Sequence, residues 1–263
     1  MAEDRLSETV TLRLGAPHVA VVTIDRPAAR NAVDSTVADG LGRAADRTEA
    51  DPDIWVVVLT GAGGKSFCAG ADLKEIAAGR ASALRTDRGG FAGLVRFERE
   101  KPWIAAVEGF ALAGGCEIAL ACDLLVASKG SVFGLPEATR GLLAAAGGLH
   151  RLPRVLPRNM AFELIATGAQ LTAERAYELG MVNRLSASGG ALDAALELGE
   201  AICRNSPGAV REALKIARMS ANLDEAPLWR ATAEAQARLS QTEDFKEGPR
   251  AFLEKRSPRW TGR

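Results

Sequence analysis

Apolar residues in the first two thirds of the chain fall into short runs separated by helical stretches. Residues 19–24 are β-branched and end at Asp25-Arg26-Pro27, which predicts a strand that enters a loop. Three further runs are continuously apolar rather than alternating, which predicts strands covered on both faces: 54–60, 103–107 and 124–128. The predicted helices between them cover 35–50, with Ser35 as N-cap, then roughly 76–100 and 115–121. This alternation through about residue 185 predicts a layered α/β core.

The last third of the chain has a different pattern. Residues 191–252 are largely helical, with predicted interruptions at Ser206-Pro207-Gly208 and Gly248-Pro249. A helical tail of this kind covers the core or packs on another subunit.

Composition excludes several classes of protein. The chain has 263 residues with 33 basic and 33 acidic side chains, a balance that argues against a nucleic-acid-binding or membrane-surface protein. No run approaches the ~18–20 apolar residues that span a bilayer, and residues 1–11 do not resemble a secretory signal. The four cysteines form no CxxC pair and there are two histidines, so we expect no zinc site. Reduced, mostly buried thiols in a cytoplasmic protein are the expectation.

Two turns rich in small residues are candidates for a ligand site. Residues 66–75 follow a predicted buried strand, and residues 111–117 open a predicted helix. Small residues let the backbone approach a ligand, and a helix start leaves N–H groups unpaired. Amides from both turns could converge on one carbonyl oxygen as an oxyanion hole. Taken singly, a Gly-Gly pair before a helix more often reflects tight packing, and neither turn has the spacing of a Walker loop or a dinucleotide fingerprint.

Two glutamates stand in apolar segments close to predicted helix starts. Glu117 falls in the first turn after Gly114-Gly115, and Glu137 follows Pro136, which suits the first position of a helix. A carboxylate there often serves only the helix dipole or cap. A pair of carboxylates nevertheless suits the addition of water, because one can take a proton from water while the other gives a proton to carbon. Burial would raise their pKa values and the helix N-termini would lower them.

Several segments, in order along nearly the whole chain, resemble the crotonase superfamily and in particular its enoyl-CoA hydratases. Residues 25–32 resemble the family's early CoA-binding turn, and 67–75 its first oxyanion segment. Residues 101–109 lead into the second oxyanion segment. Residues 133–137 resemble the second carboxylate motif, and 147–154 resemble the stretch that follows it.

The resemblance implies roles for individual residues. The backbone N–H groups of Ala71 and Gly114 would bind the thioester oxygen. Glu117 and Glu137 would hold the catalytic water, with Glu117 as the base toward water and Glu137 as the donor to the α-carbon. Coenzyme A enters as part of the substrate, with no metal or redox cofactor. The residues implied in substrate or CoA binding are Ala28, Arg30, Ala69, Asp72, Leu73, Lys74 and Lys255.

The resemblance also implies the fold and the assembly. Residues 1–200 would form the crotonase superhelix of ββα turns, and residues 201–263 a helical region used for oligomerisation, as a homotrimer or a hexamer made of two trimers. Residues 245–263 carry a local net charge of +4. There Lys255 would reach the CoA phosphates, in its own or a neighbouring subunit; a solvated basic tail is the alternative.

The chain departs from the family pattern at three places. Ala113 stands where many members have glycine, Glu108 replaces a common asparagine and adds a carboxylate near the site, and residues 142–146 lack a proline often found there. The leading hypothesis is hydration of a trans-2-enoyl-CoA to a 3-hydroxyacyl-CoA in the degradation of fatty acids or related acyl-CoA esters.

Three other functions stay open. The first is an enoyl-CoA isomerase, although such members keep only the second carboxylate. The second is a carnitinyl-CoA dehydratase-like enzyme, because residues 247–256 resemble the C-terminal segment of such enzymes. The third is a non-catalytic acyl-CoA binder, against which the two intact carboxylates speak.

Overall fold

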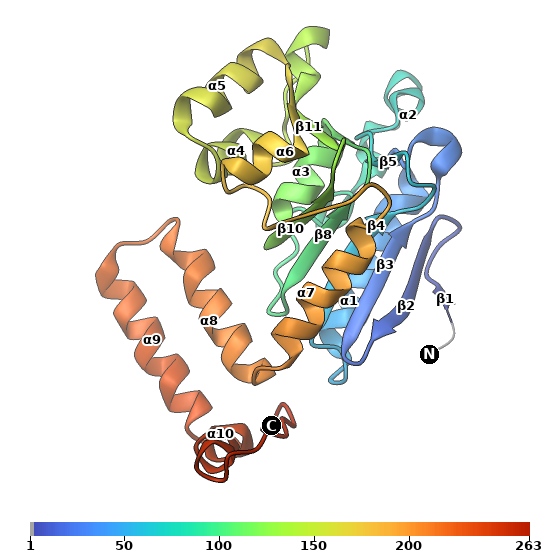
Figure 1. Cartoon of the computed structure of the whole chain (residues 1–263). Coiled ribbons are helices and arrows are strands. Elements are labelled where there is room, and N and C mark those ends of the chain that lie inside the picture. Colours follow the sequence, from blue (N-terminus) through green and yellow to red (C-terminus); the bar gives the residue numbers. More distant parts are fainter. Residues whose placement is uncertain (1–2) are drawn as a thin grey trace.

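The computed structural model describes residues 3–263, and within them a seven-stranded sheet runs through the molecule (Figure 1). Its first three strands are antiparallel, whereas every pairing from β3 onward is parallel. In spatial order the strands are β1 (Asp4–Arg5), β2 (Val10–Ala16), β3 (Val19–Ile24), β4 (Val56–Gly61), β8 (Trp103–Val107), β10 (Leu124–Ser128) and β13 (Arg184–Ser186).

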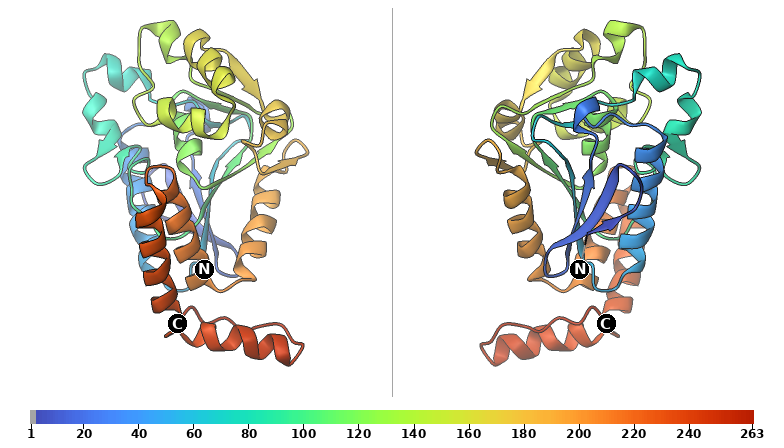
Figure 2. Two further views of the ribbon diagram at one scale, coloured as in Figure 1. Left: turned by 90° about the vertical axis from the view of Figure 1, so that its left-hand side faces the viewer. Right: turned by 90° about the vertical axis from the view of Figure 1, so that its right-hand side faces the viewer.

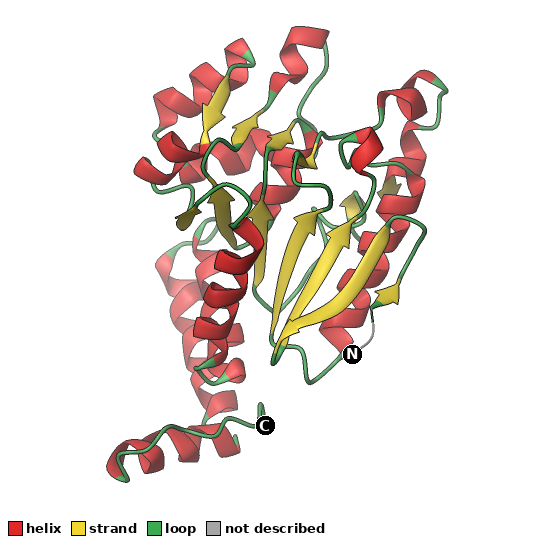
Figure 3. Cartoon of the chain, turned by 45° about the vertical axis from the view of Figure 1, so that its right-hand side comes forward, coloured by secondary structure: helices red, strands yellow, loops and turns green. Residues whose placement is uncertain are grey.

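A second sheet of four short strands lies beyond the carboxyl ends of the long parallel strands (Figure 3). β4 is followed along the chain by β5 and then α2, β8 by β9 and then α3, and β10 by β11 and then a 3₁₀ helix. Each repeat is one ββα turn, so the predicted superhelix is confirmed. The short elements are β5 (Ser66–Cys68), β9 (Phe110–Leu112), β11 (Val132–Gly134), β12 (Gln170–Thr172), α2 (Leu73–Ala77), α3 (Gly114–Ala121) and η3 (Pro136–Arg140).

Helices cover both faces of the large sheet. α1 (Ser35–Ala50) packs on β2 and β3, and α7 (Ala191–Cys203) crosses β4, β8 and β10 (Figure 1). Coverage on both sides explains why the central strands are continuously apolar. The N-cap of α1 is Asp34 and not the predicted Ser35: the Asp34 carboxylate accepts a hydrogen bond of 2.9 Å from the Val37 N–H.

The predicted helix over 76–100 is wrong. This segment contains the end of α2, a 3₁₀ helix η2 (Ala81–Leu84), and a hairpin of β6 (Arg85–Thr86) and β7 (Gly90–Phe91). Gly79, Gly90 and Gly93 have positive φ angles, which a continuing helix does not allow. The apolar residues of this segment face the core from turns and not from one helix face.

Four helices end the chain. After α7, the helices α8 (Pro207–Ser220), α9 (Glu225–Leu239) and α10 (Glu243–Leu253) extend away from the sheet (Figure 2). The predicted break at 206–208 is confirmed, with Ser206 as N-cap. The predicted break at 248–249 is wrong, because α10 continues through Pro249, and the chain turns instead at 221–224 and 240–242. Residue 200, the predicted boundary between the two regions, lies inside α7.

An ion pair fixes α8 to the core. The Arg218 guanidinium donates to both carboxylate oxygens of Asp123, at 2.7 and 2.9 Å, and to the carbonyl of Arg99 at 2.9 Å.

Three further helices, α4 (Gly148–Val155), α5 (Arg158–Thr167) and α6 (Ala173–Glu178), follow η3. Within residues 3–263 no helix combines the length and the apolarity needed to cross a bilayer. All four cysteines are free and three are buried, as the sequence predicted.

Candidate active site

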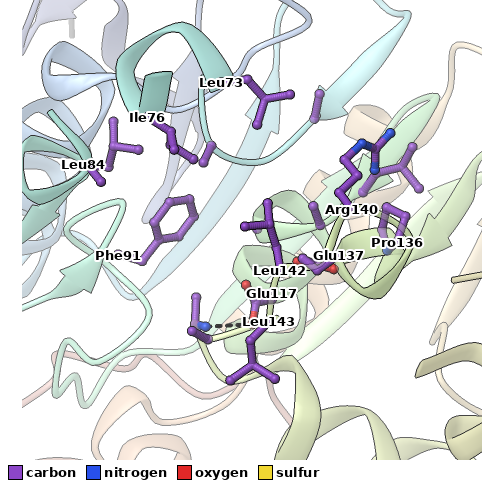
Figure 4. Close-up of a pocket in the computed structure, with 18 of the residues that line it drawn as sticks. Leu73, Ile76, Leu84, Phe91, Glu117, Pro136, Glu137, Arg140, Leu142 and Leu143 are labelled. Atoms are coloured by element: carbon purple, nitrogen blue, oxygen red, sulfur yellow. Dashed lines mark hydrogen bonds between the residues drawn. The ribbon is translucent and has the colours of Figure 1, made fainter. Parts of the chain in front are cut away.

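A cavity of about 430 Å³ lies where the first and second turns of the superhelix meet η3 and the loop before α4 (Figure 4). Most of its walls are apolar, and the carboxylates of Glu117 and Glu137 lie close together within it. The lining residues are Arg30, Ala69, Ala71, Leu73, Ile76, Ala81, Leu84, Arg85, Phe91, Leu112, Ala113, Gly114, Glu117, Pro136, Glu137, Arg140, Leu142, Leu143, Ala145 and Ala146.

The register of two short strands brings the glutamates together. β9 and β11 are parallel neighbours, with Leu112 opposite Gly134. β9 leads into α3 and β11 leads into η3, so both helices start at the same edge of the small sheet. Glu117 lies in the first turn of α3 and Glu137 in the first turn of η3. Pro136 occupies the first helical position as predicted.

Gly114 is the first residue of α3. Its N–H therefore has no carbonyl one turn earlier in the helix to bond with. The preceding Ala113 has φ 51° and ψ −129°, and its N–H bonds the Gly134 carbonyl at 2.9 Å. A Cβ added to Gly115 would lie 1.9 Å from the Cys68 carbonyl oxygen, so this second glycine serves close packing of α3 against β5.

Ala71 lies in the turn between β5 and α2. Hydrogen bonds from Val33 N–H to the Gly70 carbonyl and from Asp72 N–H to the Val33 carbonyl, both 2.8 Å, hold the residues on either side of it. Within residues 3–263 the Ala71 N–H has no backbone hydrogen-bond acceptor. A Cβ added to Gly70 would lie 2.9 Å from the Gly114 nitrogen, so the two turns touch. Both candidate amides therefore belong to the wall of one cavity.

Glu117 is almost completely buried, with 3% of its surface exposed. Its Oε1 accepts hydrogen bonds from the N–H groups of Ala146, at 2.7 Å, and Gly148, at 2.9 Å. Burial raises the pKa of the Glu117 carboxyl; these two N–H groups and the charges of Arg151 and Arg85 oppose the rise without cancelling it. The loop before α4 thus fixes the orientation of this carboxyl.

Glu137 has fewer partners. Its Oε2 is buried and forms no hydrogen bond with any described residue. Burial raises the pKa of the Glu137 carboxyl, its own backbone N–H lowers it, and the neighbouring charge of Glu117 raises it further. A buried carboxylate oxygen without a hydrogen-bond partner costs free energy of folding. Such atoms are common at positions where a bound molecule completes the hydrogen bonding.

The structure places the other predicted site residues in different surroundings. Arg30, Ala69 and Leu73 line the cavity together with Ala71, whereas Ala28 and Lys74 do not. Lys255 follows α10, which lies at the opposite end of the molecule from α2, so within one chain Lys255 does not reach the cavity (Figure 1).

Asp72 acts on the backbone and on a neighbouring arginine. Its carboxylate caps α2 by accepting from the Lys74 N–H at 3.0 Å, and it pairs with Arg26 at 3.1 Å. Burial would raise the pKa of Asp72, but the Lys74 N–H and the Arg26 guanidinium together lower it. Arg26 also pairs with Asp34 at 3.2 Å and so joins the first turn to α1. Arg26 was not predicted as a site residue, although it lies within residues 25–32, which resemble a CoA-binding turn.

Glu108 does not lie at the site, so the prediction of a further carboxylate near it is wrong. Its Oε1 accepts from the Ser128 hydroxyl at 2.5 Å and from the Gly189 N–H at 3.0 Å, and it does not line the cavity. Arg85, Phe91 and Arg140 also line the cavity, and none of the three was named as a site residue from the sequence. The hairpin that carries Arg85 and Phe91 was predicted as helix, so the approach of these two side chains to the cavity was not expected.

A family model described as enoyl-CoA hydratase/isomerase matches residues 16–263. The chain belongs to this family. Enoyl-CoA hydratase/isomerase members of known structure share its fold: an enoyl-CoA hydratase from Mycobacterium tuberculosis H37Rv is 44% identical with a TM-score of 0.92, over 97% of this chain and 99% of that one. A carnitinyl-CoA hydratase from Mycobacterium avium is 43% identical with a TM-score of 0.76, over 99% and 100%.

A curated relative in the family carries a related name. The carnitinyl-CoA dehydratase of Salmonella enteritidis PT4 is 38% identical over 98% of this chain and 100% of its own length. The family and its crotonase fold agree with the resemblance read from the sequence.

Proposed function

We propose that this protein hydrates the double bond of a trans-2-enoyl-CoA to give a 3-hydroxyacyl-CoA. The observation that carries the proposal is the meeting of two carboxyls in one cavity: the buried Glu117 and the half-buried Glu137, whose Oε2 is enclosed. The wall of that cavity also holds the Ala71 and Gly114 amides. Such a cavity offers hydrogen-bond donors for a thioester oxygen and proton-transfer groups for the neighbouring carbons.

The amides would act on the thioester. When the N–H groups of Ala71 and Gly114 donate to the thioester oxygen, they draw electron density from the conjugated double bond. The β-carbon then accepts water, and the enolate-like charge that develops on oxygen is stabilised by donors already in place. The contact between Gly70 and Gly114 supports a fixed distance between these donors.

The carboxyls would move the protons. Glu117, ionised, takes a proton from the water as its oxygen bonds to the β-carbon, and Glu137, protonated, gives a proton to the α-carbon. The net reaction adds H and OH across the double bond with no change in overall oxidation level, so the proposal needs no metal or redox cofactor. The raised pKa values of both carboxyls support their roles in proton transfer, because acid/base groups work best when their pKa lies near the working pH.

Coenzyme A would enter past the cavity residues Arg30, Ala69 and Leu73, with Ala28 and Lys74 beside them. Lys255 would then act on the CoA phosphates of a neighbouring subunit. The proposed assembly is a homotrimer or a pair of trimers, formed through the region 201–263. Its C-terminal helices expose large apolar side chains, with Trp229 68% and Phe252 82% exposed. A cytoplasmic location, in acyl-CoA degradation, completes the proposal.

The direct test is Glu137→Gln assayed with crotonyl-CoA by loss of the conjugated thioester absorbance. An acid/base group contributes about 10²–10⁴-fold, so kcat should fall by that factor while the melting temperature changes little. Glu108→Gln is the matched control, since it removes a carboxylate outside the cavity and should keep full activity. Near-full activity of Glu137→Gln would remove Glu137 from the mechanism.

The second candidate is the dehydration of carnitinyl-CoA, favoured by the 38% identical Salmonella relative. It would use the same carboxyls and amides in the reverse direction on a different acyl group. Isomerisation alone would leave Glu117 without a role. A non-catalytic binder would bind enoyl-CoA without loss of the conjugated absorbance.

A further inference from the structure

Three arginine side chains line the cavity without partners. Arg30, Arg85 and Arg140 form no ion pair and no side-chain hydrogen bond with any residue from 3 to 263. Within the same described range, Glu117 and Glu137 are the acidic side chains of the lining, and both would be occupied with proton transfer. The proposed function places Arg30 at the CoA entry and leaves the charges of Arg85 and Arg140 free to act on the substrate.

Arg85 lies on the hairpin that forms the acyl side of the cavity. It is opposite Phe91 in the β6–β7 register, and the preceding Leu84 is buried in the wall. A Cβ on Gly114 would lie 2.6 Å from the Phe91 ring, so this hairpin borders the amide that would hold the thioester. The charge of Arg85 also lowers the pKa of Glu117, in agreement with the place of both residues in the lining of one cavity.

The direction of the acyl chain follows from these positions. If CoA enters past Arg30 and Leu73 and its thioester lies at Gly114, the acyl group continues toward the side where Leu84 and Phe91 face Leu142 and Leu143 (Figure 4). The other residues of this wall are apolar. Arg85 is itself exposed, so water partly screens its charge, but the apolar surroundings leave the guanidinium to discriminate between substrate charges.

We propose that Arg85 makes the acyl end of the cavity select by charge: a 2-enoyl chain ending in a carboxylate is preferred over a neutral chain, and a neutral chain over one carrying a quaternary ammonium. The proposal rests on the proposed hydratase function and names its substrate class. A carboxylate can accept charge-assisted hydrogen bonds from the guanidinium, whereas a trimethylammonium group offers no acceptor and is repelled.

The experiment compares four 2-enoyl-CoA esters that differ at C4 of the crotonyl group. The substituents are hydrogen, carboxylate, trimethylammonium and tert-butyl, the last being a neutral match in shape for trimethylammonium. The expected order of kcat/KM places the carboxylate first and separates tert-butyl from trimethylammonium by about tenfold, or about 1.4 kcal/mol. Because those two esters have the same shape, their ratio isolates the effect of charge.

Variants assign the effect to a residue. Arg85→Met keeps the length of the side chain without its charge. The ratio of kcat/KM for the tert-butyl ester to that for the trimethylammonium ester should then fall to about threefold or less, a remainder of the size expected for other partly exposed charges. Arg85→Glu should invert the order. Arg96→Met, in the same segment but outside the lining, is the control and should match the unmodified protein.

The outcomes separate this proposal from the function it rests on. If none of the four esters is hydrated, the hydratase function itself fails. If crotonyl-CoA is hydrated but the trimethylammonium ester reacts faster than its tert-butyl match, charge selection is wrong and carnitinyl chemistry gains support. An order that persists in Arg85→Met would likewise overturn the role of Arg85. The panel on the unmodified protein decides the charge order even if a variant fails to fold.

Discussion

Replacing Glu117 in two ways separates its chemistry from its contribution to the fold. Its Oε1 accepts two backbone N–H groups, from Ala146 and Gly148. A glutamine at this position keeps a carbonyl oxygen that can accept both bonds but cannot take a proton from water. An alanine removes the acceptor as well. The two variants should therefore lose activity alike and differ in stability.

The expected magnitudes follow from these contacts. Loss of the base should lower kcat about 10²–10⁴-fold in both variants, equivalent to about 3–5 kcal/mol of transition-state stabilisation. In Glu117→Ala the Ala146 and Gly148 N–H groups lose their acceptor. At about 1 kcal/mol each, the lower end of the range because water in the cavity can replace the oxygen, unfolding becomes easier by about 2 kcal/mol. For a chain of this size that lowers the melting temperature by roughly 4–8 °C.

The assay pairs hydration of crotonyl-CoA with thermal unfolding followed by circular dichroism. Glu117→Gln should melt at or above the temperature of the unmodified protein, because it removes a buried carboxyl whose pKa burial has raised. Equal melting temperatures for the glutamine and alanine variants would show that the two N–H bonds do not hold the loop. A glutamine variant with near-full kcat would show that Glu117 is not the base.

Three further outcomes are expected. Gly70→Ala should abolish hydration of crotonyl-CoA in steady-state assays, because the residue has φ +94° and its new Cβ would lie 2.9 Å from the Gly114 nitrogen; retained activity would rule out that amide as a donor. Ala113→Gly should raise the free energy of unfolding, measured in urea, by about 1 kcal/mol. Ala113 has φ 51° and ψ −129°, a conformation that costs an alanine ~1–3 kcal/mol and that glycine adopts without strain. A destabilised variant would mean that packing of the Ala113 methyl contributes more than the backbone strain costs. The pKa values of Glu117 and Glu137 are raised above 4.5, so kcat/KM should fall, as the pH is lowered, at a midpoint above 4.5. The folded state binds these protons more tightly than the unfolded chain, so their contribution to stability should be lost as the pH rises from 4.5 through the raised values. An acid limb at or below 4.5 would contradict the raised pKa values on which both expectations rest.

The strands of the core were predictable because burial on both faces leaves a simple signal. Runs such as 54–60 and 103–107 contain almost no polar residue, and their short length and β-branched residues favour a buried strand over a buried helix. The segment 76–100 was not predictable in the same way. Its apolar residues enter the core from turns, and their spacing imitates a helix until the positive φ angles of Gly79, Gly90 and Gly93 are known.

The parts of the site could be named from local sequence, whereas their assembly was expected only through the resemblance to the family. Glu117 and Glu137 could be named from their positions after small residues and Pro136. That they share a cavity depends on the pairing of β9 with β11, a contact between distant segments that local sequence does not encode. Arg85 reaches the cavity only because the β6–β7 hairpin folds against it, so it carried no sequence signal.

The complete burial of α3 has a consequence for how this scaffold can change. Every residue from Gly114 to Ala121 is enclosed, so the helix that carries Glu117 has no room for variation. Other parts of the cavity wall are made by exposed residues such as Leu73, Leu142 and Leu143. Under the proposed function, the base lies on an enclosed helix, whereas part of the wall that meets the substrate lies on exposed segments. Libraries for new acyl groups should randomise the outer segments and leave the central helix untouched.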